Sequence, residues 1–154
     1  MPHAVEHLLV GRHGSYNGGG SNPGLSQSGQ AQAAVMAQAI LDRMPGLQCT
    51  ILSSTAARAA EFAKIMAELL GVEAQKHECF RDDSYHLGGE PECRKLMLAC
   101  TTPVLIVVSH KDLTSGLIGG FTGEAFGKRH WPAELSYGQY WHVQNNDSNP
   151  VRLP

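Results

Sequence analysis

The chain has 154 residues, 42% of them hydrophobic, and we expect residues 1–154 to form a single domain with its own core. Twelve Lys and Arg against 14 Asp and Glu give a net charge of -2, which excludes the strongly basic surface that a nucleic-acid-binding protein needs. The apolar runs are far shorter than the roughly 18 residues of a membrane span, and a secretory signal pattern is missing at the N-terminus. We therefore expect a cytoplasmic protein with no membrane partner.

The cysteines and histidines bear on redox state and metal binding. The cysteines are Cys49, Cys79, Cys93 and Cys100. Their irregular spacing, without a C-x-x-C pair, is typical of reduced thiols. Among the eight histidines, only His3 and His7 have a suggestive spacing, but they would need a helix and instead lead into an apolar stretch typical of a strand. We expect neither a metal site nor a cofactor.

The first part of the chain predicts a strand, a loop and a helix. Residues 4–10 are short, branched and apolar, and Gly11 closes this predicted strand. Residues 14–24 contain three consecutive glycines and an Asn-Pro pair, which predict a loop. Ser26 then stands at the N-cap of a helix with regularly spaced apolar residues, which ends at Pro45.

A second strand and a second helix follow. Residues 49–52 form a short apolar run, and we expect Thr55 to be the N-cap of the next helix. The apolar stripe of that helix is Phe62, Ile65, Met66, Leu69 and Leu70. Gly71 supplies its C-terminal signal, and residues 72–77 are a candidate third strand.

The second half contains the clearest strand. We expect a loop over residues 79–92, a short helix over 92–100 and a strand over 103–108, which is apolar throughout. A further helix is expected over residues 110–119, and a final strand over 137–143. Strands that alternate with helices predict an α/β fold, a three-layer α/β/α sandwich with a mainly parallel central sheet.

Cationic and imidazole side chains follow three of the predicted strands. Arg12 and His13 come after the first strand, and His110 comes after the clearest one. Arg58 lies in the first turn of a helix, where the helix dipole disfavours a cation unless an anion binds there. Ligands of open α/β sheets bind at the carboxyl ends of strands, and guanidinium groups match phosphate oxygens. Each residue alone is compatible with a structural or solvated role, but together they predict a pocket for a dianion.

Four motifs in order resemble the histidine phosphatase superfamily, which includes the phosphoglycerate mutases and small phosphohistidine phosphatases. V-G-R-H-G at residues 10–14 resembles its Arg-His-Gly signature, and L-S-Q-S-G-Q-A-Q-A at 25–33 resembles its L-[ST]-x-x-G-x-x-Q-A motif. S-S-T-A-A-R-A at residues 53–59 is similar to S-S-P-x-x-R-A, and V-S-H at 108–110 is similar to the strand end that carries the second histidine. The resemblance implies a phosphoglycerate mutase-like fold.

The same resemblance implies a metal-independent phosphatase with a phosphohistidine intermediate. His13 would attack phosphorus, since covalent catalysis divides the hydrolysis into two steps. Arg12, Arg58 and His110 would hold the phosphate oxygens. Asn17 is a further candidate phosphate ligand, although it is out of register with the Asn of the mutase branch, whose place Gly19 takes.

A general acid must protonate the leaving group, and several carboxylates are candidates. Asp82 is the first choice, because F-R-D-D-S-Y at residues 80–85 loosely resembles L-x-E-x-x-[YF]-G of the mutase branch. Asp83, Glu90 and Asp112 stay open as alternatives.

The resemblance also bears on the substrate. The short chain leaves little length for a lid, so we expect an open site that accepts a phosphorylated small molecule or a phosphoprotein, and we expect mutase activity less. The alternative is a noncatalytic phosphate- or phosphoprotein-binding module of the same fold. Residues 123–154 contain both tryptophans and are compatible with an edge strand, a partner surface or a wall of the substrate site.

Overall fold

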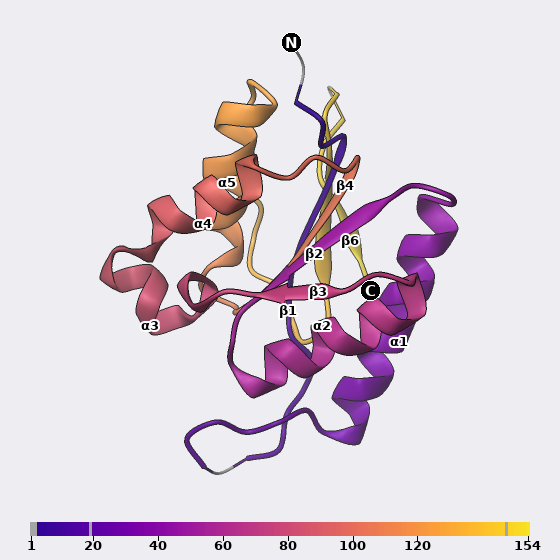
Figure 1. Cartoon of the computed structure of the whole chain (residues 1–154), viewed down its shortest axis with the longest axis vertical. Helices are drawn as coiled ribbons and strands as arrows, with labels where there is room; N and C mark the ends of the chain where they lie inside the picture. Colours follow the sequence, from indigo (N-terminus) through magenta and orange to yellow (C-terminus); the bar gives the residue numbers. More distant parts are fainter. Residues whose placement is uncertain (1–2, 19, 147) are drawn as a thin grey trace.

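A six-stranded sheet runs through the middle of the protein, with helices on both sides (Figure 1). The computed structural model describes residues 3–18, 20–146 and 148–154. The strands are β1 (His7–Arg12), β2 (Cys49–Ser53), β3 (Ala74–Lys76), β4 (Val104–Ser109), β5 (Tyr140–Gln144) and β6 (Val151–Leu153). The helices are α1 (Gln27–Arg43), α2 (Ala57–Leu70), α3 (Asp82–Ser84), α4 (Glu90–Leu98) and α5 (Thr114–Ala125), with short helical segments η1 (Glu78–Phe80) and η2 (Tyr85–Gly89).

The sheet is mainly parallel, as the sequence predicts. Its strand order is β3-β2-β4-β1-β5-β6. The neighbours β3, β2, β4 and β1 pair in parallel, whereas β5 is antiparallel to both β1 and β6. In the register of β1 and β4, Arg12 lies opposite Ser109, so the carboxyl ends of the two strands meet at the same edge of the sheet. This edge is at the lower end of the sheet in Figure 1.

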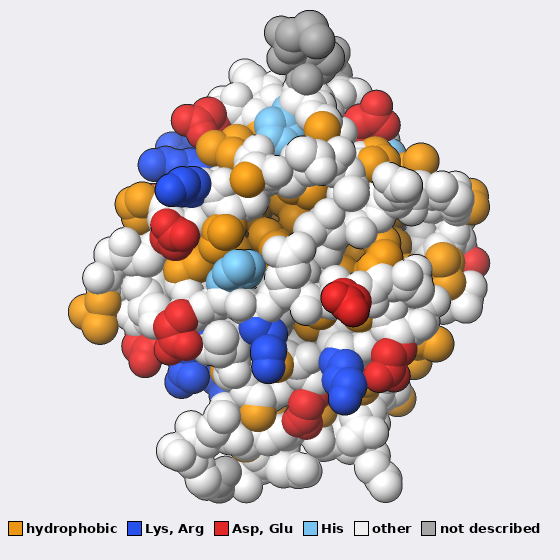
Figure 2. Space-filling view, in the orientation of Figure 1, with side chains coloured by type: hydrophobic (Ala, Val, Ile, Leu, Met, Phe, Trp, Pro, Cys, Tyr) orange, Lys and Arg blue, Asp and Glu red, His pale blue; other side chains and the backbone are white. Residues whose placement is uncertain are grey.

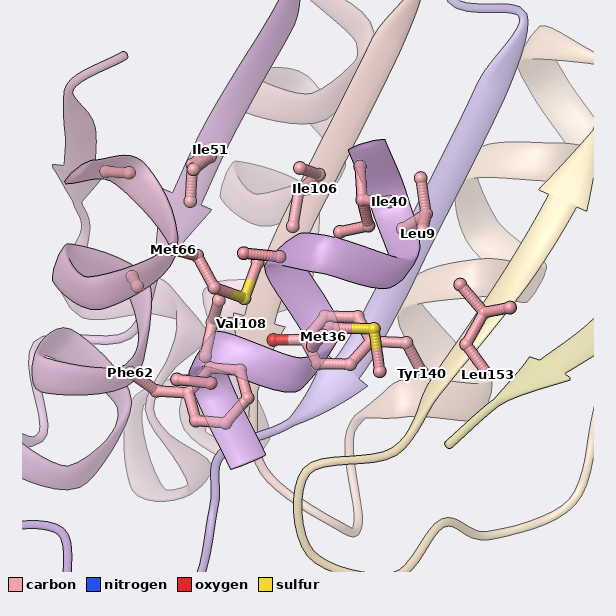
Figure 3. Packing of buried hydrophobic residues seen from close by; sticks show 14 of the residues in the cluster. Leu9, Met36, Ile40, Ile51, Phe62, Met66, Ile106, Val108, Tyr140 and Leu153 are labelled. Carbon is pink, nitrogen blue, oxygen red and sulfur yellow. The ribbon is translucent and has the colours of Figure 1, made fainter. Parts of the chain in front are cut away.

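Two hydrophobic clusters, one on each face of the sheet, join it to the helices on either side, which gives the three predicted layers. Side chains of β4 alternate between them because successive side chains of a strand point to opposite faces. Val104, Ile106 and Val108 pack in the cluster beneath α1 and α2. Leu105 and Val107 pack in the cluster beneath α4 and α5. Labelled members of the first cluster in Figure 3 are Leu9, Met36, Ile40, Ile51, Phe62, Met66, Ile106, Val108, Tyr140 and Leu153.

One of the two predicted N-caps is confirmed and the other is wrong. Ser26 caps α1, since its side chain accepts from the Gly29 N–H at 3.1 Å. Thr55 does not cap α2: the N-cap position belongs to Ala56, and the Thr55 hydroxyl donates instead to Glu78 at 2.8 Å. The Ala56 N–H is satisfied by the Ser54 hydroxyl at 3.1 Å, so the helix start is held by the preceding serine.

The predicted loop over residues 79–92 is wrong, because the segment is largely helical. It contains most of η1, all of α3 and η2, and the start of α4. Phe80 is fully buried and anchors the segment in the second cluster. Asp82 and Asp83 lie in the first turn of α3, where acidic side chains favour a helix start.

The predicted limits of the later elements also shift. The helix expected over residues 110–119 is α5, which begins at Thr114 and continues beyond Gly119 to Ala125. Glycine is a common stop signal, but the ring of Trp131 packs against Gly119 inside this helix. The final strand is β5, and β6 follows it without having been predicted.

Two features bear on membrane and charged partners, the helices and the distribution of charge on one face of the molecule. In the described part of the chain, no helix is long and apolar enough to cross a membrane. Acidic and basic side chains are interspersed on the face shown in Figure 2. The four cysteines are free thiols.

Gly11 provides a test of the core next to the site. A Cβ added at Gly11 would lie 2.2 Å from Cγ of the fully buried Tyr140. We expect Gly11→Ala to lower the free energy of unfolding in urea by about 1–3 kcal/mol, because the overpacked core must shift. Gly18→Ala is the control, since nothing lies within 4 Å of its added Cβ. An equal loss in both variants would contradict the packing described here.

Candidate active site

Backbone hydrogen bonds to β4 bring the ends of the three central strands together. The His13 N–H donates to the Ser109 carbonyl at 3.2 Å, and the Ser54 N–H donates to the Val108 carbonyl at 3.0 Å. The rings of His13 and His110 consequently lie with centroids 5.2 Å apart, nearly perpendicular to each other. Residues from sequence positions almost a hundred residues apart therefore share one site.

His13 is a buried, neutral imidazole with its two nitrogens in different roles. Nδ1 lies 2.8 Å from the Gly14 carbonyl, to which it donates, and Nε2 accepts from the Arg58 Nε–H at 3.2 Å. Burial, together with the charges of Arg58 and Arg12, lowers the pKa of His13 to about 4, against the opposing effect of the Gly14 hydrogen bond. The ring is 3% exposed, and its Nε2 carries a lone pair.

The loop after His13 is held against α1 by the second of the sequence motifs. A Cβ on Gly29 would lie 2.1 Å from the Ser15 carbonyl oxygen, so only glycine permits this approach. The Gln32 side chain accepts from the Ser15 N–H at 2.9 Å. The Ser15 and Ser26 hydroxyls are 2.7 Å apart. This motif therefore positions the loop behind His13.

His110 has one satisfied nitrogen and one unsatisfied nitrogen. Its Nε2 lies 2.9 Å from the Ser54 hydroxyl, which also accepts from the Ala56 N–H. When Ser54 donates to Nε2, the imidazole proton is on Nδ1. Nδ1 is buried and has no hydrogen-bond partner among the described residues. Burial, together with the effects of His13 and Arg58, lowers the pKa of His110 to about 3, so its ring is also neutral near pH 7.

Each of the two arginines lies over a tyrosine ring. The Arg12 guanidinium is 3.8 Å from the centroid of the Tyr137 ring, and the Arg58 guanidinium is 5.1 Å from that of Tyr16. Arg12 Nη1 also donates to the Leu135 carbonyl at 3.4 Å. Both arginines are adjacent to His13, since Arg12 precedes it in the chain and Arg58 donates to its Nε2.

The C-terminal segment supplies one wall of the site. The Gly138 N–H donates to the His13 carbonyl at 3.1 Å, and the Arg12 N–H donates to the Gln139 carbonyl at 3.1 Å. Of the three roles considered for residues 123–154, the structure therefore supports an edge strand in β6 and a wall in residues 135–139. Sequence analysis missed Tyr16, Ser54 and Tyr137 as site residues. The position of Ser54 just after the second predicted strand, and that of Tyr16 in the predicted loop after His13, could have indicated these two residues.

Among the candidate acids, Asp82 lies beside His110. Its Oδ2 is 4.0 Å from His110 Nδ1, and its Oδ1 is buried without a partner among the described residues. Burial raises the pKa of the Asp82 carboxyl, and the negative charge of Asp112 raises it further. Asp82 also lines a cavity of about 130 Å³ together with Arg58 and His110.

The other candidates lie in different surroundings. Asp83 lines the same cavity but is exposed and pairs with Arg81 at 3.5 Å. Glu90 pairs with Arg94 at 3.5 Å and lines a different cavity. Asp112 is exposed and acts on Asp82 through its charge.

Asn17 lies on the exposed loop beyond His13. Its amide donates to the Leu25 carbonyl at 3.5 Å, and its N–H donates to the Gly24 carbonyl at 3.1 Å. These contacts are within the loop, so Asn17 stays a proposed phosphate ligand. Gly19 lies outside the described residues.

The two histidines with suggestive metal spacing have separate partners. His3 Nε2 contacts the Leu98 carbonyl at 2.7 Å, whereas His7 Nδ1 contacts His142 Nε2 at 3.0 Å. Within residues 3–18, 20–146 and 148–154, no group of three or more His, Cys, Asp or Glu side chains is arranged to hold a metal ion.

Comparisons with known proteins place this geometry in a family. The model of the histidine phosphatase superfamily (branch 1) matches residues 8–88. Residues 8–88 include both the Arg-His-Gly segment and Asp82. Comparison with curated proteins finds no significant match.

Solved structures with the same fold include several phosphatases. A protein assigned as the phosphohistidine phosphatase SixA from Agrobacterium tumefaciens aligns with a TM-score of 0.70 at 19% identity, covering 97% of this chain and 98% of that chain. The protein histidine phosphatase SixA complexed with tungstate aligns at 0.66 and 16% identity, covering 90% and 87%. A mycobacterial glucosyl-3-phosphoglycerate phosphatase in complex with VO3 aligns at 0.59 and 18% identity, covering 90% and 92%. These similarities show a shared fold.

The lowered pKa of His13 predicts a pH-dependent stability. Because the folded pKa of about 4 lies below the ordinary value of 6.5, the unfolded chain binds a proton that the folded chain does not between these pH values. The stability that the neutral form of His13 contributes is fully present above pH 6.5 and is lost as the pH falls toward the folded pKa. We expect this residue to account for about 2 kcal/mol of stability lost between pH 7 and pH 5.

Urea unfolding of the wild type and His13→Asn at both pH values measures this contribution. The variant should lose less stability on acidification, whatever its stability at pH 7. Equal losses in the two proteins would show that His13 titrates normally.

Proposed function

The chain belongs to the histidine phosphatase superfamily and is a phosphatase, and from this premise we propose that it hydrolyses a phosphomonoester or a protein phosphoramidate through a phosphohistidine on His13, without a metal ion. The observation that carries the proposal is the buried, neutral His13 imidazole, whose unprotonated Nε2 accepts from the Arg58 guanidinium. A nucleophile must offer a lone pair, and a dianion must meet positive charge. This arrangement supplies both.

The first step transfers the phosphoryl group to His13. In the resting site the Arg58 Nε–H points at Nε2, and an arriving dianion offers this donor a stronger acceptor, which releases the lone pair. Nε2 then attacks phosphorus while the bond from phosphorus to the leaving oxygen or nitrogen breaks. The Gly14 carbonyl accepts from Nδ1–H and stabilises the positive charge that the ring acquires.

In this proposal three groups hold the transferring phosphoryl oxygens. Arg12 and Arg58 supply guanidinium donors, and His110 supplies a buried Nδ1 that has no partner among the described residues. An unpaired buried N–H costs free energy, so an oxyanion that accepts from it would be favoured. Asn17 is proposed as an additional ligand from the loop. The two arginines neutralise charge in the way that a metal ion does in other phosphatases.

We assign the general acid to Asp82. The raised pKa of its carboxyl increases the protonated fraction, and its position beside His110 puts it next to the transferring group. Its proton passes to the leaving atom in the first step. The resulting carboxylate accepts a proton from the water that attacks phosphohistidine. The P–N bond to Nε2 then breaks, and inorganic phosphate and neutral His13 are restored.

Two classes of substrate fit this mechanism, a phosphorylated small molecule and a phosphoprotein. The solved structures of similar fold carry names from both classes, protein histidine phosphatase and glucosyl-3-phosphoglycerate phosphatase, in complexes with oxyanions. A phosphoramidate has the less demanding leaving group, because its nitrogen departs readily once it is protonated.

His13→Ala tests the covalent route. We expect its kcat/KM for p-nitrophenyl phosphate to fall by at least about a thousandfold, because the nucleophile is lost. EDTA should leave the wild-type rate unchanged, and wild-type enzyme denatured at alkaline pH during turnover, where the P–N bond of phosphohistidine survives, should carry one phosphoryl group on His13 by mass spectrometry. A variant as active as the wild type would refute the intermediate, and loss of activity in EDTA would refute metal independence. Phosphate binding without turnover would support the noncatalytic module.

Asp82→Asn tests the acid. We expect kcat for an alkyl phosphate to fall by about 10²- to 10⁴-fold, the usual contribution of general acid catalysis. The loss should be much smaller for p-nitrophenyl phosphate, because p-nitrophenolate can leave without a proton. Asp83→Asn is the matched control, since Asp83 lines the same cavity but is exposed and paired with Arg81. Similar losses of kcat in both variants would exclude Asp82 as the acid. An equal loss for the alkyl phosphate and for p-nitrophenyl phosphate would exclude it as well.

A further inference from the structure

Two tyrosine rings form a corner at the mouth of the site. Tyr16 follows β1 and Tyr137 precedes β5, and their ring centroids are 5.9 Å apart at an interplanar angle of 85°. The His13 ring centroid lies 5.5 Å from that of Tyr16 and 6.1 Å from that of Tyr137. Tyr16 is 38% exposed and Tyr137 is 39% exposed, whereas His13 is 3% exposed. A molecule bound at His13 therefore lies beside these two rings.

The backbone holds both rings in place. Tyr16 forms an isolated antiparallel bridge with Leu25, in the loop that packs on α1. The neighbour of Tyr137, Gly138, donates its N–H to the His13 carbonyl at 3.1 Å. Because both anchors tie the tyrosines to the segments around His13, the corner is part of the site and not of a separate surface.

The arginines connect the corner to the bound phosphate. The guanidinium of Arg12 lies over Tyr137 and that of Arg58 over Tyr16, so each ring is adjacent to a proposed phosphate-binding cation. These contacts restrain the two guanidiniums through cation–π attraction. They also place aromatic surface directly beside the position of the phosphate, where the group attached to phosphorus must lie.

We propose that Tyr16 and Tyr137 select substrates whose phosphate is carried on a flat ring. The inference rests on the proposed function, because it assumes that phosphorus binds at Nε2 of His13. A flat ring attached to that phosphorus can stack on one tyrosine and meet the other edge-on, an arrangement that aromatic pairs favour. Such a pair gives about a two- to tenfold gain in affinity over an aliphatic group of similar size. An aryl phosphate ester and an imidazole phosphoramidate share this chemistry.

Binding of two phosphonates by calorimetry tests the corner without any turnover. At a pH above the second pKa of both compounds, phenylphosphonate and cyclohexylphosphonate carry the same charge and differ in the flatness of the ring. We expect the wild type to bind phenylphosphonate at least about threefold more tightly. A preference for cyclohexylphosphonate, or no preference, would overturn the proposal without any variant being made.

Variants then locate the preference. Tyr16→Leu and Tyr137→Leu should each bring the ratio of the two Kd values close to one, whereas the corresponding Phe variants should keep it. Trp131→Leu is the matched control, because Trp131 is a 60% exposed aromatic residue that lines a different cavity. The ratio separates ring selection from arginine positioning, since a displaced arginine weakens both phosphonates equally. A ratio that survives both Leu substitutions would refute the role of the tyrosines.

Turnover measurements distinguish the two candidate substrate classes, aryl phosphate esters and imidazole phosphoramidates. We expect the Leu variants to lower kcat/KM for phenyl phosphate, phosphoimidazole or both, while that for an alkyl phosphate falls less. The substrate with the larger loss identifies the physiological chemistry as ester or phosphoramidate. An inactive enzyme that keeps the phosphonate preference would refute the hydrolytic mechanism alone. An active enzyme without the preference would refute the aromatic corner alone.

Discussion

The in-register parallel pairing of β1 with β4 is the constraint on which the site depends. Arg12 lies opposite Ser109, so the residue after each strand, His13 and His110, is brought to the same edge of the sheet. All six residues of β4 are buried between the two helical layers. A slip of one residue would turn the side chains of one hydrophobic cluster toward the other, at the cost of both cores. The hydrophobic core therefore sets the spacing of the two imidazoles.

Burial also sets the protonation state of the site. The same layers that cover the sheet exclude water from His13 and His110, and this desolvation is the largest cause of their lowered pKa values. Arg12 and Arg58 are less buried than the two neutral rings beside which they lie. A low local dielectric strengthens the attraction between these cations and a dianion. Burial of the site therefore has two effects: it keeps the His13 imidazole neutral, and it strengthens the attraction between the arginines and a dianion.

Local patterns predicted the parts of the fold that local physics controls. The capping of α1 by Ser26 and the apolar β4 depend on residues a few positions apart. The helical segment between η1 and α4 escaped prediction because the burial of Phe80, a tertiary contact, orders it. The extension of α5 past Gly119 has a similar cause, since Trp131 packs on the glycine that would otherwise signal the helix end.

The sequence by itself determined that buried strands end in Arg12-His13 and Ser109-His110 and that a cation opens the second helix, which was enough to predict an anion pocket. Only the tertiary structure decided which carboxylate lies next to His110 and that Tyr137 covers Arg12. Periodicity reports burial and direction within one element, whereas these contacts join elements far apart in the chain. They depend on the order of strands and the path of the connections, which no local pattern encodes.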